Sequence, residues 1–270
     1  MTVLAPHSSA LKQFRLDGRT AFVSGAAGHL GRAMTMALAD AGAAVIINGR
    51  NDARLAAFEN ELASAGHTVT RAAFDVADLD AARKFFAGLD RLDILVNNAV
   101  AMTPKPFDAL TAGDFDETYR SAVTAAFEAV RAALPALRAG VAATGEASVI
   151  NVASMYGAVS PDKRIYSRPE QASPFHYGPA KAALIQLTRH LAAELGPERI
   201  RVNALVPGPF PRPAVAASDP GFAERLAGRT MLGRTGEAGE IAGPLLFLAS
   251  PAASFVTGSS LAVDGGWTAW

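Results

Sequence analysis

One tyrosine and one lysine lie four residues apart in the sequence YGPAK, which spans residues 177–181. In a helix, side chains at positions i and i+4 share one face, so Tyr177 and Lys181 are expected to be neighbours. An ammonium group beside a phenol favours the phenolate and predicts a lowered pKa for Tyr177. Such a tyrosine exchanges a proton with an alcohol or carbonyl oxygen near neutral pH. Ser154 follows an apolar segment at 148–153 and supplies a hydroxyl group where open α/β sheets bind ligands.

The composition excludes several other kinds of site. The chain has 270 residues, of which half are apolar, a formal net charge of zero and no cysteine. Disulfides, thiolate zinc sites and cysteine nucleophiles are therefore excluded, and no basic block indicates a nucleic-acid or membrane partner. The histidines show no metal-ligand spacing, so we expect no metal site. The first residues lack the order of a secretion signal, which predicts a cytoplasmic protein.

Short apolar segments rich in Val and Ile alternate with longer helical segments along the whole chain. Most of the short segments are apolar throughout, as expected for parallel strands that are covered on both faces. The expected strands span residues 20–24, 44–48, 68–74, 93–97, 148–153, 201–206 and 260–264. The expected helices span residues 30–41, 52–65, 78–88, 114–138, 175–195 and 238–249. This alternation predicts a single α/β domain over 1–270, a doubly wound parallel sheet with an N-terminal extension at 1–15.

A glycine-rich segment, SGAAGHLG, follows the first expected strand and opens the first expected helix. Gly25 permits a tight turn and Gly31 lets the helix pack closely, so a pyrophosphate can lie against the helix N-terminus. His29 and Leu30 of this segment are further candidate cofactor contacts. The second expected strand ends in the sequence NGR, with no carboxylate to bond both hydroxyl groups of an NAD ribose. Arg50 at this position suits a 2′-phosphate and favours NADP(H) over NAD(H).

Taken together, these segments resemble the short-chain dehydrogenase/reductase family over about residues 16–266. The resemblance rests on SGAAGHLG, FDV (74–76), NNA, NVASMYG, YGPAK, IRVNALVPGP and VDGG. It implies a Rossmann-like fold with a seven-stranded parallel sheet and helices on both faces, a nicotinamide cofactor and a homotetramer. Within the family, the chain resembles gluconate 5-dehydrogenase-like members.

The resemblance also implies roles for the residues that match the family motifs. Tyr177 is the expected acid/base, Ser154 binds the substrate oxygen, and Lys181 tunes Tyr177 and holds the nicotinamide ribose. A carbonyl group between the hydroxyls of Ser154 and Tyr177 accepts hydride at carbon while Tyr177 gives a proton to oxygen. Further cofactor contacts are implied for Asp75, Val76, Asn98, Ala99, Pro207 and Gly208.

Several features of the chain depart from the family pattern. His29 stands at the usual middle glycine, and Val100 replaces the glycine of NNAG, where it narrows the nicotinamide pocket. Ala122 stands where the family generally has an asparagine that helps to hold a water in the proton relay behind the lysine. Ser154 and Tyr177 are also farther apart in sequence than is usual, and the additional segment is expected at the substrate mouth. The candidate contacts there for a polar or anionic substrate are Tyr156, Arg164, Tyr166 and Arg168.

The favoured hypothesis is an NADP-preferring oxidoreductase that interconverts a secondary alcohol and a ketone. A polar sugar acid, polyol or cyclitol is the favoured substrate, and an acyl-carrier or lipid-like substrate stays open. Because Ala122 and Val100 depart from the family pattern, the contrasting hypothesis is a cofactor-binding protein with weak turnover. A dehydratase or epimerase on the same scaffold is a third alternative.

A long irregular segment at 207–232 is rich in proline and glycine and starts at the strand end that is expected to meet the nicotinamide. Long irregular segments in compact domains often cover active sites, so we expect a mobile substrate lid. Phe210 supplies apolar surface for it, and Arg212 is available for an anionic substrate. At the C-terminus, Trp267 and Trp270 are expected to be buried against a partner subunit.

Overall fold

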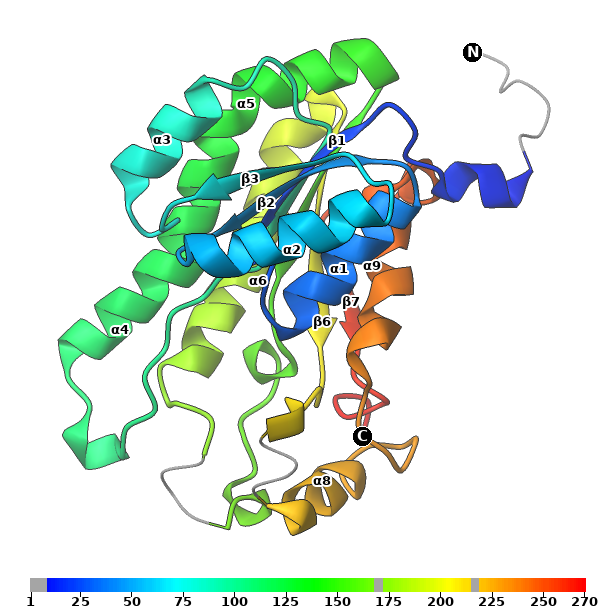
Figure 1. Ribbon diagram of the computed structural model, residues 1–270. Coiled ribbons are helices and arrows are strands. Elements are labelled where there is room, and N and C mark those ends of the chain that lie inside the picture. Colours follow the sequence, from blue (N-terminus) through cyan, green and yellow to red (C-terminus); the bar gives the residue numbers. More distant parts are fainter. Residues whose placement is uncertain (1–8, 168–171, 215–218) are drawn as a thin grey trace.

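The structure is a computed structural model that describes residues 9–167, 172–214 and 219–270. Its strands form a parallel sheet in the order β3-β2-β1-β4-β5-β6-β7 (Figure 1). The strands are β1 (Thr20–Ser24), β2 (Ala44–Gly49), β3 (Val69–Ala73), β4 (Ile94–Asn97), β5 (Ala147–Val152), β6 (Ile200–Pro207) and β7 (Ser260–Val263). All seven predicted strands are confirmed, with bounds that differ from the expected ones by a single residue at most.

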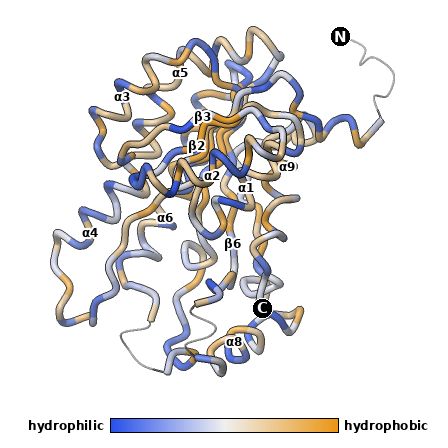
Figure 2. Tube along the Cα trace, in the orientation of Figure 1, coloured by the Kyte–Doolittle hydropathy of each residue, from blue (hydrophilic) through white to orange (hydrophobic). Residues whose placement is uncertain are grey.

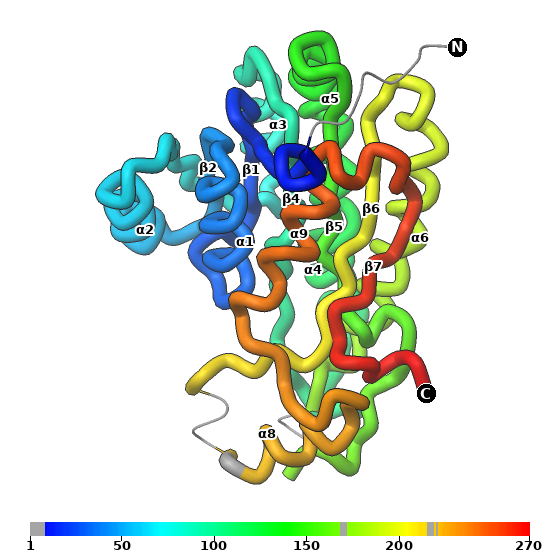
Figure 3. The backbone as a smooth tube through the Cα atoms, turned by 90° about the vertical axis from the view of Figure 1, so that its right-hand side faces the viewer, coloured from blue at the N-terminus to red at the C-terminus, as the bar shows by residue number. Residues whose placement is uncertain are grey.

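Helices cover both faces of this sheet, as the two views in Figure 1 and Figure 3 show. The α-helices are α1 (His29–Asp40), α2 (Asp52–Ser64), α3 (Leu79–Ala87), α4 (Ala112–Tyr119), α5 (Ala125–Thr144), α6 (Tyr177–Leu195), α8 (Pro220–Ala227) and α9 (Ala242–Ala249). Helices α1, α2 and α9 pack on one face, and α3, α5 and α6 pack on the other. The protein therefore has the doubly wound α/β fold that the sequence predicts.

The sheet divides the apolar core into two layers. In β1, Ala21 and Val23 point into the layer beneath α1 and α9, whereas Phe22 points into the layer against α3 and α5. The ring of Phe22 meets that of Phe86 in α3, with centroids 4.9 Å apart. Successive side chains of a strand point to opposite faces, so a strand that is buried on both faces needs an unbroken apolar run. Figure 2 shows the result as hydrophobic strands at the centre and more hydrophilic outer helices.

The strand order reverses between β1 and β4, which are neighbours in the sheet but not in the sequence. The chain leaves β1 toward β2 on one side and leaves β4 toward β5 on the other side. The loops that follow these two strands therefore diverge and leave a crevice at the carboxyl edge of the sheet. Open α/β sheets bind ligands at this kind of switch point.

The helix predicted over 114–138 is interrupted and runs farther than expected. Helices α4 and α5 are joined by a π-helical turn at Arg120–Thr124, and α5 continues to Thr144. Ala122 lies within this turn, is buried, and belongs to a segment that packs against α6. A π turn inserts an extra residue into a helix and is frequent at functional sites. Apolar periodicity did not predict the turn, because the residues on both sides of it stay helical.

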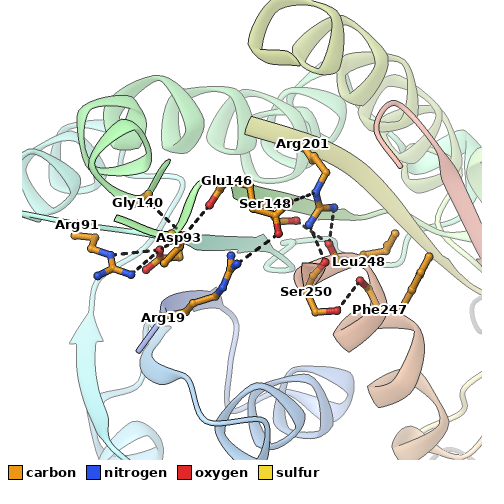
Figure 4. A network of polar contacts seen from close by, with 11 residues as sticks. Arg19, Arg91, Asp93, Gly140, Glu146, Ser148, Arg201, Phe247, Leu248 and Ser250 are labelled. Atoms are coloured by element: carbon orange, nitrogen blue, oxygen red, sulfur yellow. Dashed lines mark hydrogen bonds and ion pairs between the residues drawn. The ribbon is translucent and has the colours of Figure 1, made fainter. Parts of the chain in front are cut away.

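The opposite edge of the sheet, at the amino ends of the strands, carries a buried network of charges (Figure 4). Glu146 pairs with Arg19 at 3.4 Å and with Arg201 at 3.1 Å. Arg201 also donates to the carbonyl oxygens of Leu248 and Ser250, at 2.9 and 3.0 Å. Arg19 directly precedes β1, Glu146 precedes β5 and Arg201 lies in β6. The network therefore joins three strands to the end of α9.

The predicted N-terminal extension at 1–15 is described only from Ser9 onward. Ala10–Phe14 form a short 3-10 turn whose side chains are largely exposed. Leu16, by contrast, is fully buried and belongs to the core. No helix in the described part of the chain is both long and apolar enough to cross a membrane.

The two tryptophans at the C-terminus differ in their surroundings. Trp267 is only 5% exposed and packs against Met155, Ile165 and Leu226 of the same chain. Trp270 is 71% exposed. The prediction that both tryptophans need a partner subunit for burial is therefore wrong for Trp267, because the segments after β5 and β6 already cover it.

Candidate active site

Ser154, Tyr177 and Lys181 come together at the carboxyl end of β5. Ser154 follows this strand and accepts a hydrogen bond from the backbone N–H of Tyr156 at 3.2 Å. Tyr177 is the first residue of α6, and Lys181 lies one turn later. The Lys181 ammonium group lies 5.6 Å from the centre of the Tyr177 ring and donates to the carbonyl oxygen of Val152 at 2.6 Å. The strand thus fixes the lysine, and the helix brings the tyrosine to it.

Burial dominates the electrostatics of the tyrosine and the lysine. It lowers the pKa of Lys181 to about 8. It also raises the pKa of Tyr177, an effect that the neighbouring Ser154 hydroxyl partly offsets. The prediction of a net lowered pKa for Tyr177 is therefore not met in this structure, where the effect of burial dominates. The reason is desolvation, which disfavours the charged form of each group.

Gly25, Gly28 and Gly31 extend from the end of β1 into the first turn of α1, where a dinucleotide would be held, and are called the glycine cradle below. Gly25 has a φ of +64°, which favours glycine, and a Cβ atom at Gly31 would lie 2.1 Å from the carbonyl oxygen of Gly25. Helix α1 begins after Gly28 with no side-chain cap, so its first N–H groups are left for another acceptor. These features fit the pyrophosphate of a nicotinamide dinucleotide, which needs close backbone approach and N–H donors.

Ser24 ties the end of β1 to the loop after β4. Its hydroxyl oxygen accepts hydrogen bonds from the backbone N–H groups of Asn98 and Ala99, at 2.9 and 3.0 Å. The Asn98 amide donates to the carbonyl oxygens of Ser24 and Gly25, at 2.9 and 3.2 Å. Asn98 therefore positions backbone at the switch point, and it also lines the cavity as a residue in contact with the cofactor would.

One end of the site lies beyond β2 and β3. Arg50 follows β2 and pairs with Asp75 at 3.7 Å, with both side chains largely exposed. Exposed pairs of this kind contribute little energy, so the arginine is easily redirected to another anion. Val76 follows Asp75 and lines the same cavity.

The other end of the site lies beyond β6. A Cβ atom at Gly208 would come within 2.4 Å of the Asp264 backbone, so the chain passes this point only as glycine. Phe210 and Arg212 follow and reach back over the cavity toward His29. Burial and the nearby Arg212 charge lower the pKa of His29, and the Phe210 carbonyl group partly offsets this.

A continuous cavity of about 410 Å³ connects all of these groups. It is lined by sixteen of the residues singled out in the sequence: Gly25, His29, Leu30, Gly31, Arg50, Asp75, Val76, Asn98, Ala99, Ser154, Tyr177, Lys181, Pro207, Gly208, Phe210 and Arg212. Residues at the ends of six different strands, β1 to β6, thus meet in a single cleft at the carboxyl edge of the sheet.

Comparison with known proteins places the chain in a family. The family model described as enoyl-(acyl carrier protein) reductase matches residues 25–268. The galactitol 2-dehydrogenase (L-tagatose-forming) of Cereibacter sphaeroides is 38% identical over 95% of this chain and 98% of its own length. The chain belongs to the short-chain dehydrogenase/reductase family. It is therefore an NAD(P)-dependent oxidoreductase that acts on CH–OH and C=O groups.

Two further members of the short-chain dehydrogenase/reductase family are similar over nearly the whole chain. A gluconate 5-dehydrogenase from Burkholderia cenocepacia, solved in complex with NADP and tartrate, superposes with a TM-score of 0.85 at 32% identity. The alignment covers 97% of this chain and 100% of that one. The rhamnolipids biosynthesis 3-oxoacyl-[acyl-carrier-protein] reductase of Pseudomonas aeruginosa is 34% identical over 94% of this chain and 98% of its own length.

The segment after Ser154, which is longer than is usual in the family, does not bring its predicted substrate contacts to the cleft. The Arg164 side chain is 84% exposed and pairs with Asp162 at 2.8 Å. The hydroxyl groups of Tyr156 and Tyr166 bond each other at 2.9 Å, and neither residue lines the cavity. Arg168 lies outside the described residues.

The segment after Ser154 packs against α8, a contact that the sequence did not predict. The Arg225 side chain donates to the carbonyl oxygen of Ile165 at 2.6 Å and pairs with Asp219 at 2.7 Å. The rings of Tyr166 and Phe222 lie 5.6 Å apart. The segment therefore supports the region after β6 instead of entering the cleft itself.

Ser121 lines the cavity although it was not among the predicted site residues. It lies in the π turn beside Ala122, and its hydroxyl oxygen accepts a hydrogen bond from the backbone N–H of Ala101 at 3.0 Å. It thereby holds the loop that carries Val100 against α4. The departure at Ala122 was the available signal, because a changed residue in the family motif directs attention to its neighbours.

Proposed function

We propose that the protein is an NADP-preferring dehydrogenase/reductase that interconverts a polar secondary alcohol and its ketone. The observation that carries this proposal is that Ser154, Tyr177 and Lys181 line the same cavity as the glycine cradle at Gly25 and Gly31. This shared cavity supports a site in which proton transfer and dinucleotide binding occur together. A tyrosine, a serine and a lysine are the groups that alcohol–ketone interconversion requires of the protein.

The protein's own residues control the proton and the substrate oxygen in this proposal. The nicotinamide of a bound cofactor supplies or accepts the hydride. Ser154 donates a hydrogen bond to the substrate oxygen, and Tyr177 exchanges a proton with that same oxygen. Because burial raises the pKa of Tyr177, the neutral phenol is its resting form and is ready to donate. Lys181, fixed by the Val152 carbonyl group, places a positive charge beside the phenolate that forms.

NADP preference is proposed from Arg50 and the absence of a carboxylate at Gly49. A Cβ atom at Gly49 would make only ordinary contacts of 3.6 Å or more with Leu55, so a side chain is tolerated there. Gly49→Asp combined with Arg50→Gln is expected to shift the ratio of kcat/KM from NADP toward NAD by about tenfold or more. Initial rates with both cofactors measure the shift. Tighter binding of NAD than of NADP by the native protein would contradict the proposal.

The substrate proposed is a sugar acid, polyol or cyclitol. This choice is supported by the similarity to a galactitol dehydrogenase and a gluconate 5-dehydrogenase. The second candidate is an acyl thioester, which the similarity to a 3-oxoacyl reductase and the apolar Val100, Met102 and Phe210 in the cavity favour. Turnover in a panel that crosses NAD(H) and NADP(H) with sugar acids, polyols and 3-oxoacyl thioesters decides between them.

We propose that residues 207–232 cover the substrate as a lid. Phe210 and Arg212 line the cavity, and α8 within this segment packs against residues 165–167. Residues 215–218 lie outside the described residues. Hydrogen exchange with and without cofactor and substrate tests this proposal, and high protection that ligands leave unchanged would count against it.

A homotetramer and a cytoplasmic location are also proposed. Exposed apolar side chains such as Phe255, Leu232 and Trp270 offer surface for subunit contacts. A cytoplasmic enzyme has direct access to the cellular pool of nicotinamide cofactor. Light scattering at micromolar concentration and cell fractionation test the two proposals, and a monomeric mass would contradict the first.

A further inference from the structure

His29 has an unusual environment at the start of α1. Its Nε2 atom is buried and has no hydrogen-bond partner among the described residues. A buried polar atom without a partner costs about 1–3 kcal/mol, so its retention calls for a function. The family generally has glycine at this position, which shows that the backbone here does not need an imidazole. The side chain is therefore a departure from the usual family pattern.

Arg212 lines the same cavity as His29. It lies in the segment after β6, is exposed, and is close enough for its charge to lower the pKa of His29. Two basic side chains thus line one cavity close to each other, one from the glycine cradle and one from the segment that precedes α8. Groups that repel each other in this way are stabilised together by an anion placed between them.

The position of His29 indicates which anion fits. The imidazole belongs to the cradle itself, beside Gly28 and the uncapped N–H groups of α1. A substrate carboxylate would lie by Ser154 and Tyr177, beyond β5. We propose that His29 and Arg212 form a clasp that holds the cofactor's pyrophosphate from two sides. This clasp rests on the proposed function, and it moves Arg212 from the expected substrate contacts to the cofactor.

The clasp also involves the segment after β6. Phe210 lies between Gly208 and Arg212, and its carbonyl group faces His29. An anion that draws Arg212 toward His29 therefore draws the segment after β6 toward the glycine cradle.

Direct binding of NADPH, followed by its fluorescence, tests the clasp without any turnover. His29→Gly and Arg212→Gln are each expected to raise the dissociation constant of NADPH about tenfold. The double variant is expected to bind little more weakly than either single variant, because the two residues act as a unit. His29→Gln keeps a hydrogen-bond donor and should lose less than His29→Gly. Arg164→Gln, which removes an exposed charge outside the cavity, is the matched control and should bind as the wild type does.

Adenosine 2′-monophosphate serves as the second probe, because it lacks a pyrophosphate. Its affinity, measured by displacement of NADPH, should change less than about twofold in the same variants. NADPH binding by His29→Gly that is as tight as in the wild type would overturn the clasp, as would equal losses for both probes. These results leave the proposed function intact. A wild-type protein that binds neither NADPH nor NADH would instead contradict the proposed function.

Discussion

The two edges of the parallel sheet bury similar chemical groups in opposite ways. At the amino edge, Glu146 lies between Arg19 and Arg201, and nearly all the polar atoms of this network have partners. At the carboxyl edge, Lys181 has the Val152 carbonyl group as its hydrogen-bond partner and no carboxylate within ion-pair distance among the described residues. A buried charge with a counter-ion links the strands that carry the two groups. A buried charge without a counter-ion lowers the stability of the fold, and its pKa is shifted, as is common for groups that take part in a reaction.

Asp93 shows how thoroughly the amino edge is satisfied. Its carboxylate is fully buried and accepts hydrogen bonds from the Thr20 backbone N–H at 2.8 Å, from Arg91 at 2.9 Å and from the Thr144 hydroxyl at 3.1 Å. Both carboxylate oxygens therefore have hydrogen-bond partners. Asp93 and Lys181 are both buried, so burial alone does not distinguish a functional group, whereas the lack of a counter-ion at Lys181 does distinguish it from Asp93.

Replacing Tyr177 by phenylalanine is expected to have the largest effect, and only on the reaction. Loss of the proton donor should lower kcat by about 10²–10⁴-fold, while the free energy of unfolding changes by no more than about 1 kcal/mol. Steady-state rates and denaturant unfolding measure the two quantities. Tyr166→Phe is the matched control, since the hydroxyl group of Tyr166 bonds that of Tyr156 and the residue does not line the cleft. Wild-type rates in Tyr177→Phe would remove this residue from the reaction.

Glu146→Gln is expected to destabilise the amino edge of the sheet and to leave kcat unchanged. It leaves Arg19 and Arg201 buried without a counter-charge, which should lower the free energy of unfolding by about 3–5 kcal/mol. Glu61→Gln, which removes a partner of Arg32 on the surface, should cost less than about 1 kcal/mol. Urea unfolding compares the two variants. An equal loss of stability in the two variants would show that the buried network has no special role. A lowered kcat in the folded Glu146→Gln variant would contradict the view that the amino edge serves stability alone.

Lys181→Met is expected to increase stability while it removes activity. The drop in pKa from about 10.5 to about 8 means that burying the charge costs roughly 3 kcal/mol. Loss of the hydrogen bond to Val152 offsets about 1 kcal/mol of this, so a net gain of about 2 kcal/mol is expected at pH 7. Thermal unfolding of this variant and the wild type at several pH values measures the gain.

The pH dependence of that gain provides its control. The unfolded chain binds the Lys181 proton up to about pH 10.5, whereas the folded protein loses it near pH 8. The cost of the charge is therefore complete below pH 8 and fades as the pH rises toward 10.5. The stability advantage of Lys181→Met should fade over the same range. A variant less stable than the wild type at pH 7 would show that the lysine supports the fold.

The sequence by itself predicted the order of strands and helices, because both faces of a parallel sheet demand unbroken apolar runs that are visible without coordinates. It also brought together Ser154, Tyr177 and Lys181, since the family motif, the helical spacing and the strand end all point to the same edge. Gly25 and Gly31 were predicted for the same reason, because a tight turn and a close helix contact can be met only by glycine. Local sequence therefore predicts those features that depend on local backbone geometry.

Only the tertiary structure decided the surroundings of each side chain. Arg164 was expected to contact the substrate but pairs with Asp162. Trp267 was expected at a subunit contact but packs in a small apolar cluster of its own chain. The pKa of Tyr177 is raised instead of lowered. Arg212 faces His29, far from it in sequence. Solvation and charge depend on every atom within several ångströms. Segments distant along the chain supply most of those atoms, so spacing within one helix or loop could not predict them.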